Sequence, residues 1–412
     1  MNTEKKLIPL LRFPEFVRNT EWICTTLKAE MDYENGVAHE NDIDTFGKYI
    51  VVNSKFISTE GQIEKRTNSA RCLAKEKDIL MVLSDLPNGK AIAKCFYVDA
   101  SNKYTVNQRI CKLRSKGANS KLLYYIINRN PYFLSFDDGV KQTNLKKEEV
   151  LNCPLILPKS IEEQSVIAEC LFSIDSYISF INEKVEQLKA HKKGLLQKLF
   201  PQRGKTVPEY RFTEFKGSKG WEEKRLGDIF KRITNKNVTN NKNVLTISAQ
   251  YGLVSQYDFF HKNVAASNLS NYFLLKKGDF AYNKSRSQGY PYGAIKPLRL
   301  YDEGVVSTLY ICFRIKCCDI VDSFFEHYFE TELINEEIGQ IAQEGARNHG
   351  LLNVSTDDFF NKVVLLIPPP SEQKKIAECL SSIDRTIKLY SEKASLLEQH
   401  KKGIMQQLFP QL

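Results

Sequence analysis

Two loop segments combine cations, amides and tyrosines in the pattern that nucleic-acid contact requires. Residues 282–292 read YNKSRSQGYPY, and residues 84–90, SDLPNGK, form a smaller counterpart in the first half of the chain. Lys and Arg bind phosphates, Asn, Gln and Arg form paired hydrogen bonds to purine edges, and Tyr packs on sugars or bases. Two later polar segments, 137–144 and 344–353, add further candidates. One such loop alone is usually a solvated turn, but recurrence at matching places in both halves favours a binding role.

These four segments supply the predicted nucleic-acid contacts. In the first half the candidates are Ser84, Asn88, Lys90, Lys141 and Gln142. In the second half they are Asn283, Lys284, Arg286, Gln288, Tyr290, Tyr292, Arg347 and His349.

The sequence holds no convincing catalytic or metal-binding constellation. The tripeptide GKT at 204–206 resembles the end of a phosphate-binding loop, but the glycine that should precede it falls at Leu199. NPYF at 130–133 resembles the tetrapeptide with which adenine methyltransferases hold a target amino group, yet no glycine-rich cofactor strand precedes it. The histidines and cysteines show no metal-ligand spacing. We therefore predict no catalytic residue and no metal site.

The composition predicts an ordinary globular protein with a basic surface. No apolar run approaches 18 residues and the first six residues are polar, so we expect neither a membrane span nor a signal peptide, and a cytoplasmic location. The net charge is +10, whereas segments 160–202 and 371–412 together hold twelve basic and eleven acidic side chains. The excess positive charge therefore lies in the remaining segments, which favours a polyanionic partner for them, although a basic surface also serves solubility alone.

A long helical pattern occurs twice in the chain. Residues 160–202 align without a gap on 371–412 at a shift of 209, and about 23 of 40 positions are identical. Apolar residues spaced alternately three and four apart predict a coiled-coil seam, interrupted in both copies by Lys192 and Lys401. A lone run of this kind is usually one helix packed on a domain, but two copies in matching phase favour mutual pairing. The predicted seam residues are Ile167, Leu171, Ile174, Ile178, Leu188, Ile376, Leu380, Ile383, Ile387 and Leu397.

The duplication extends to the segments before each helix. A motif of Pro, Arg, Phe, Glu and Phe followed by Trp22 and Leu27 recurs, at a shift of 199, before Trp221 and Leu226. The predicted domains are therefore 1–159, a helix at 160–202, a second globular domain at 203–370 and a second helix at 371–412. Within the second domain the pattern predicts one long strand over 304–315 and one helix over 322–343.

The repeated helix motifs resemble those of the specificity subunits of type I restriction–modification systems. The residues that carry the likeness are Glu163-Gln164, Ile167-Ala168 and Ile174-Asp175, repeated at Glu372-Gln373, Ile376-Ala377 and Ile383-Asp384. The likeness covers nearly the whole chain and implies an α+β fold. Two similar target-recognition domains would be separated by two long helices that pair as an antiparallel coiled coil with pseudo-two-fold symmetry. The DNA backbone has two-fold axes perpendicular to its length, and two similar readers on one groove are best related by such an axis. If the helices lie along the duplex, the same axis makes them antiparallel.

That resemblance also implies a function without catalysis. Each recognition domain would read one half of a bipartite, asymmetric site in double-stranded DNA, and the helices would set the gap. Two modification (methyltransferase) subunits would dock on the helices, and two restriction (translocase and nuclease) subunits would join them. S-adenosylmethionine, ATP and Mg would then bind to the partners and not to this chain. The alternative is a duplicated coiled-coil adaptor that binds only proteins.

Overall fold

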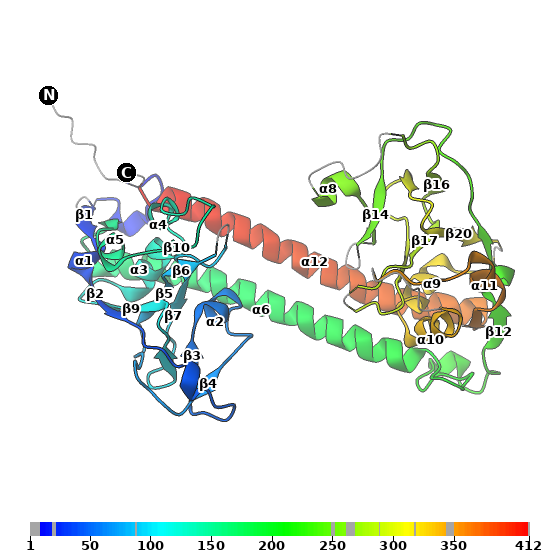
Figure 1. Cartoon of the computed structure of the whole chain (residues 1–412), viewed down its shortest axis with the longest axis horizontal. Coiled ribbons are helices and arrows are strands. Elements are labelled where there is room, and N and C mark those ends of the chain that lie inside the picture. The colour runs from blue at the N-terminus through cyan, green and yellow to red at the C-terminus, as the bar shows by residue number, and fades with distance from the viewer. Residues whose placement is uncertain are drawn as a thin grey trace. The chain divides into compact units, whose positions relative to one another are not determined.

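Two helices of 39 residues each, α6 (Ile161–Leu199) and α12 (Pro370–Leu408), occupy the two repeated segments (Figure 1). At 1.5 Å per residue each is roughly 60 Å long. The Ser160 hydroxyl accepts a hydrogen bond from the Glu163 amide at 3.2 Å and so caps α6. Pro370 occupies the first turn of α12, where a missing amide donor costs little. The two predicted long helices are therefore present.

The computed structural model describes residues 9–18, 22–86, 89–248, 252–260, 268–287, 289–316, 319–342 and 350–410. The chain divides into two compact units, each of which is described by itself. Unit 1 comprises residues 1–182 and 392–412, and unit 2 comprises residues 183–391. Each unit therefore contains one globular domain together with part of α6 and part of α12. Among the described residues, no helix combines the length and apolarity needed to cross a membrane.

The first domain is built on a four-stranded antiparallel sheet in the order β2-β9-β5-β7. A second sheet places β3 between β4, which is antiparallel to it, and β8, which is parallel. Strand β1 pairs with β11, and β6 pairs with β10. The strands are β1 (Ile23–Thr26), β2 (Met31–Asn35), β3 (Tyr49–Val52), β4 (Arg66–Thr67), β5 (Ile79–Val82), β6 (Ser84–Asp85), β7 (Cys95–Tyr97), β8 (Tyr104–Val106), β9 (Ile110–Ser115), β10 (Thr143–Asn144) and β11 (Pro154–Leu157). The helices are α1 (Leu27–Glu30), α2 (Ser54–Ser58), α3 (Ser120–Ile127), α4 (Pro131–Leu134) and α5 (Lys147–Leu151).

The second domain repeats this plan. Its main sheet has the order β13-β20-β17-β18, so that β13, β20, β17 and β18 match β2, β9, β5 and β7 of the first domain. Strand β12 pairs with β21, β14 with β15 and β16 with β19. The strands are β12 (Glu222–Arg225), β13 (Phe230–Arg232), β14 (Leu245–Ser248), β15 (Gly252–Ser255), β16 (Phe273–Lys276), β17 (Phe280–Asn283), β18 (Ala294–Pro297), β19 (Glu303–Val306), β20 (Ile311–Ile315) and β21 (Val364–Ile367). The helices are α7 (Leu226–Ile229), α8 (Gln256–Phe260), α9 (Asp322–Tyr328), α10 (Glu332–Ile341) and α11 (Thr356–Asn361).

Two predicted elements of the second domain are wrong. The single strand expected over 304–315 is two strands, because β19 pairs with β16 whereas β20 pairs with β13 and β17, and the chain turns between the sheets. The amide of Tyr310 donates to the carbonyl of Ser307 in that turn, at 3.1 Å. The helix expected over 322–343 is broken between α9 and α10, where the Thr331 hydroxyl donates to the Tyr328 carbonyl at 2.6 Å. Such a side-chain bond competes with continued helix.

Both long helices contribute to the core of each unit. In unit 1, Ile167 and Leu171 of α6 share one apolar core with Trp22 of the domain and Leu408 of α12. In unit 2, Leu199 of α6 and Ile376 and Leu380 of α12 are buried with the aromatic residues of the second domain. Burial of this apolar surface is the main force that joins helix and domain.

Candidate nucleic-acid interface and helix junctions

The structure brings together the two candidate loops of the first domain. Ser84 of β6 pairs with Asn144 of β10, and the Gln142 amide donates to the Ser84 hydroxyl at 2.7 Å. Ser84 is buried, and therefore braces the loops, whereas Lys90, Lys141 and Gln142 are exposed. Three of the predicted residues are thus available at the surface of one paired structure. Asn88 lies outside the described residues.

Carboxylates hold both of these loops in fixed conformations. Asp85 accepts hydrogen bonds from the backbone amides of Ala91 at 2.6 Å and Ile92 at 3.1 Å. Asp138 accepts from the amides of Val140 and Lys141, and these bonds lower the pKa of Asp138. The loops therefore present their side chains from a preorganised backbone, which lowers the entropic cost of binding.

The second domain pairs its candidate loops in the same way. The Arg286 amide donates to the Gly350 carbonyl at 2.8 Å, and the Leu352 amide donates to the Lys284 carbonyl at 3.0 Å. The loop after β17 therefore lies against the segment after α10, as the loop after β5 lies against β10 in the first domain. Burial lowers the pKa of Lys284, while Arg286 is exposed. Gln288, Arg347 and His349 lie outside the described residues.

Three other candidates in the second domain have structural roles. The Tyr290 hydroxyl donates to Glu330 at 2.8 Å and accepts from Lys296 at 3.2 Å, and Lys296 also forms an ion pair with Glu330. Burial, followed by the charge of Glu330, raises the pKa of Tyr290. The carbonyl of Tyr292 accepts from the Tyr282 hydroxyl at 2.7 Å, and its ring lies against α10. The Asn283 side chain accepts from the Ser285 amide at 3.1 Å.

A buried ion pair joins the first segment of each domain to the start of a long helix. Arg12 donates to both oxygens of Glu163, at 2.7 and 2.8 Å, and the Trp22 indole donates to the same carboxylate at 3.2 Å. Arg211 and Glu372 repeat this pair at 2.8 and 2.6 Å. The sequence predicts no partner role for the two arginines, although they occupy matching places in the repeated motif at the start of each domain.

The glutamines that follow these glutamates make a second junction. Gln164 donates to the Pro158 carbonyl at 2.8 Å and accepts from the Asn119 amide, just before α3, at 2.7 Å. Gln373 repeats both bonds with the Pro368 carbonyl, at 2.9 Å, and the Val321 amide, just before α9, at 3.0 Å. The repeated Glu-Gln dipeptide therefore orients each domain on a helix and is not placed to contact a ligand.

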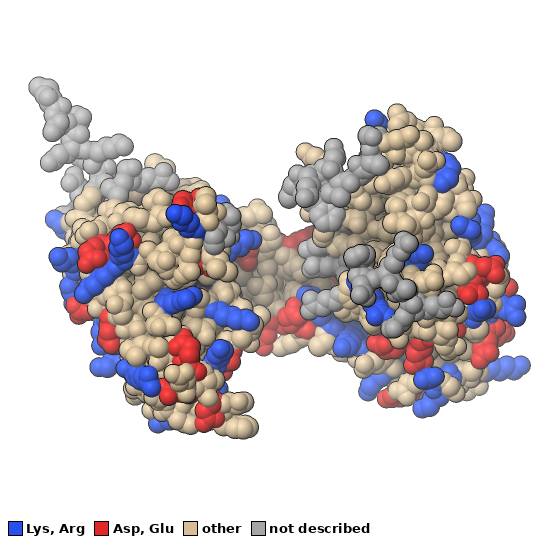
Figure 2. Space-filling view, in the orientation of Figure 1, with Lys and Arg blue, Asp and Glu red and all other residues tan. Residues whose placement is uncertain are grey.

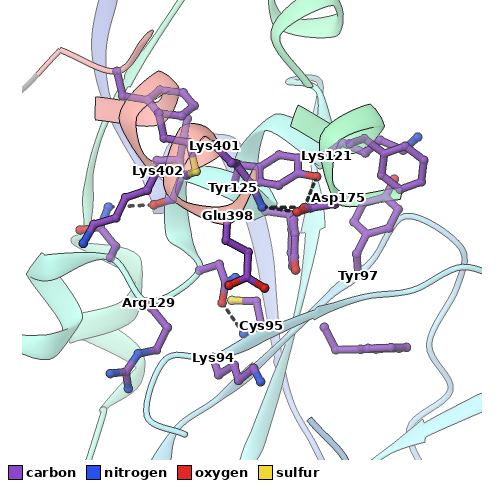
Figure 3. A pocket seen from close by; sticks show the side chains of 18 of the residues that line it. Lys94, Cys95, Tyr97, Lys121, Tyr125, Arg129, Asp175, Glu398, Lys401 and Lys402 are labelled. Carbon is purple, nitrogen blue, oxygen red and sulfur yellow. Dashed lines mark hydrogen bonds and ion pairs between the residues drawn. The ribbon is translucent and has the colours of Figure 1, made fainter. Parts of the chain in front are cut away.

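The seam lysines bind aspartates of the other long helix. In unit 1 the Lys401 ammonium lies 2.6 Å from both oxygens of Asp175, which also accepts from the Tyr125 hydroxyl at 2.8 Å (Figure 3). In unit 2 Lys192 contacts both oxygens of Asp384 at 2.6 Å. Within unit 1, Lys401 therefore meets Asp175 while the later Leu408 shares a core with the earlier Ile167, so the helix segments are antiparallel.

The predicted seam residues do not form one uniform strip. Ile167, Leu171, Ile376 and Leu380 are buried in the domain cores together with residues of the globular domains. Ile178 is also buried. Half-buried positions are Ile174, Leu188, Ile383, Ile387 and Leu397. The apolar positions at the start of each helix therefore pack against a domain, whereas Ile178 in the middle of α6 is buried outside the domain cores.

A histidine lies beside the ion pair of unit 2. His327 Nδ1 is 3.8 Å from Asp384, and Nε2 is 3.0 Å from the Ser381 hydroxyl. Burial, followed by the charges of Lys192 and nearby cations, lowers the pKa of His327 to about 3. His327 is therefore neutral at physiological pH, and Lys192 provides the positive charge opposite Asp384.

A cavity of about 1300 Å³ opens in unit 1 beside the Asp175–Lys401 pair (Figure 3). Its lining includes Arg129, Glu398 and Lys402, as well as part of the NPYF segment. The Asn130 side chain of that segment caps α4: it accepts from the Tyr132 amide at 2.9 Å and donates to the Ile126 carbonyl at 2.8 Å. The described residues hold no cluster of three or more His, Cys, Asp or Glu side chains suited to a metal ion.

Comparisons with known proteins agree with this duplicated architecture. Residues 26–190 and 218–399 each match the model of the type I restriction modification DNA specificity domain. Two relatives come from Methanocaldococcus jannaschii. The MjaX type I restriction enzyme specificity subunit is 24% identical over 69% of this chain and 65% of its own length. The MjaVIII specificity subunit is 27% identical over 96% of this chain and 92% of its own length.

A solved structure has the same fold. The S subunit of a type I restriction–modification system from M. genitalium aligns with a TM-score of 0.61 at 16% identity, over 98% of this chain and 99% of that structure. At this identity the likeness concerns the fold alone.

Proposed function

This chain belongs to the type I restriction–modification DNA specificity subunits, and we propose that each of its two domains reads one half of a bipartite, asymmetric DNA site. The observation that carries the proposal is the paired loop structure repeated in both domains. In the first domain the loop after β5 is hydrogen-bonded to a later polar loop, and in the second domain the loop after β17 is hydrogen-bonded in the same way. Because these loops differ in sequence while their scaffolds agree, the two half-sites are expected to differ.

In this proposal each copy of the repeat supplies one recognition domain and one long helix. Residues 1–159 and 203–370 are the recognition domains, and residues 160–202 and 371–412 are the conserved helices. The helices serve as a spacer that sets the gap between half-sites. In this proposal Lys90, Lys141, Gln142, Lys284 and Arg286 contact DNA; Lys284 is half-buried and the other four are exposed.

The helices also present a docking surface for modification subunits. Phe180 of α6 is 60% exposed and Leu389 of α12 is 66% exposed, and the two positions are equivalent in the repeat. Exposed apolar side chains at equivalent places fit two copies of one partner. Methylation with S-adenosylmethionine and ATP- and Mg-dependent cleavage then belong to two modification and two restriction subunits. This chain supplies recognition and no catalytic group.

The deciding experiment maps methylated adenines in DNA from cells that carry the whole system. Two separated half-sites with a constant gap are expected, and insertion of one turn into both α6 and α12 should widen the gap. A constant gap after insertion would refute the spacer role. The adaptor alternative predicts no DNA affinity for the complex at any salt concentration, whereas a DNA reader binds with an affinity that falls linearly with salt on logarithmic axes.

A further inference from the structure

The second domain contains a long stretch without any acidic residue. Between residues 230 and 257 there are four cations, Lys231, Arg232, Lys236 and Lys242, and no Asp or Glu. All four are exposed. Among the residues that the structure describes, none of these four forms an ion pair with a carboxylate, whereas other cations of the domain, such as Arg299 and Arg314, do. In the view of Figure 2, Lys and Arg occur at the top and along the right side of unit 2, and most of its Asp and Glu lie in the lower half.

The stretch is held in a fixed shape by a buried asparagine. The Asn237 side chain accepts from the Asn241 amide at 2.8 Å and donates to the Asn241 carbonyl at 2.9 Å. The Asn237 amide donates to the Tyr272 carbonyl at 3.0 Å, which ties the loop to the start of β16. The Lys236 ammonium donates to the Asn271 carbonyl at 2.8 Å and lies 4.6 Å from the centre of the Phe273 ring. The loop is therefore held rigidly, with the Lys236 ammonium against the start of β16 and Val238 87% exposed.

Backbone pairing places this loop beside the start of β16. Strands β13 and β17 run in the same direction, because both are antiparallel to β20. Arg232 at the end of β13 and Phe280 at the start of β17 both pair with Phe313, so the basic loop leaves the main sheet one strand length before the loop with Lys284 and Arg286. The basic loop continues along β16, where the Leu274 amide donates to the Asn235 carbonyl at 2.9 Å.

We propose that residues 231–243 form a second DNA-contacting element of this domain, with Lys236 and Lys242 bound to backbone phosphates. The inference rests on the proposed function and deepens it, because it assigns a positioning contact in addition to the base-reading loops. Cations on a preorganised loop that pair with no carboxylate among the described residues fit a polyanion, since no carboxylate must be displaced and little order is lost on binding. Phosphate contacts fix register and carry no sequence information.

The test measures DNA binding by the full chain assembled with its modification subunits, from 50 to 200 mM salt. Each lost phosphate contact lowers the logarithmic salt slope by about 0.9. Lys236→Ala with Lys242→Ala should therefore lower the slope by about 1.8. The ratio of the affinity at 50 mM salt to that at 200 mM salt then falls about twelvefold. The loss should be equal on specific and unrelated DNA, because phosphates are common to both.

Two matched variants make the result decisive. Lys276→Ala with Lys277→Ala removes the same charge from exposed lysines of the domain that pair with Glu303 at 3.8 Å and Asp302 at 3.7 Å, and should keep the original slope. Lys236→Arg with Lys242→Arg retains the charges and should also keep it. An unchanged slope in the alanine variant, or a defect only in subunit assembly, would overturn the inference. Absence of DNA binding by the unaltered complex would overturn the proposed function together with it.

Discussion

The ion pair between Lys401 and Asp175 offers a direct test of how the last part of α12 is held in unit 1. Lys401→Met keeps most of the aliphatic side chain and removes the ammonium. Among the residues that the structure describes, the Tyr125 hydroxyl then remains as a donor to Asp175. The change also removes a cation from a position 4.8 Å from the centre of the Tyr125 ring.

The expected cost follows from the partial burial of the pair. The side chains of Lys401 and Asp175 are 20% and 36% exposed. Exposed pairs contribute about 0.2–1 kcal/mol, and breaking a fully buried pair costs about 3–5 kcal/mol. We therefore expect Lys401→Met to lower the free energy of unfolding of unit 1 by about 2 kcal/mol, and a double-mutant cycle with Asp175→Asn to give a coupling of about 1.5 kcal/mol.

Tryptophan fluorescence can follow unit 1 separately, because the chain has two tryptophans and each unit contains one. In a Trp221→Phe background the signal during urea unfolding comes from Trp22, which is buried in the core of unit 1. The exposed Asp99–Lys103 pair of unit 1 is the control, with an expected coupling of about 0.3 kcal/mol. A coupling for Lys401 and Asp175 no larger than that of the control would refute the reasoning.

Three further results are expected. Glu163→Gln should lower the free energy of unfolding by about 3 kcal/mol, because it leaves the buried Arg12 guanidinium without its counter-charge, and a unit 1 midpoint unchanged in urea would contradict this. Lys284→Ala with Arg286→Ala should reduce methylation at one half-site only, and equal loss at both half-sites in methylation mapping would show a general defect instead. In the folded protein burial lowers the pKa of His327 to about 3, whereas its ordinary pKa is 6.5. Protonation therefore favours the unfolded state below pH 6.5, and the free energy of unfolding falls by about 1.4 kcal/mol per pH unit as the pH drops from 6.5 towards 3. His327→Gln should flatten that slope in urea titrations at pH 5 and 7, and an equal slope in both proteins would show that another group is responsible.

The sequence by itself determined the duplication, the two long helices and the α+β class. Helical periodicity, caps and proline stops are local signals, so they predicted helices close to Ile161–Leu199 and Pro370–Leu408 without knowledge of the fold. The sequence also predicted matching polar loops in the two halves. The hydrogen bond from Gln142 to Ser84 joins two of these loops in the first domain.

Only the tertiary structure decided which side chains meet. Lys192 is an anomaly in an apolar pattern until Asp384, far along the chain, is seen to bind it. Tyr290 was predicted to contact DNA because of its residue type, yet its hydroxyl is hydrogen-bonded inside the domain to Glu330 and Lys296. The strand expected over 304–315 divides because its two parts join different sheets. Periodicity is a property of neighbouring residues, whereas ion pairs, buried hydroxyls and sheet membership depend on partners that only chain folding brings within a few ångströms.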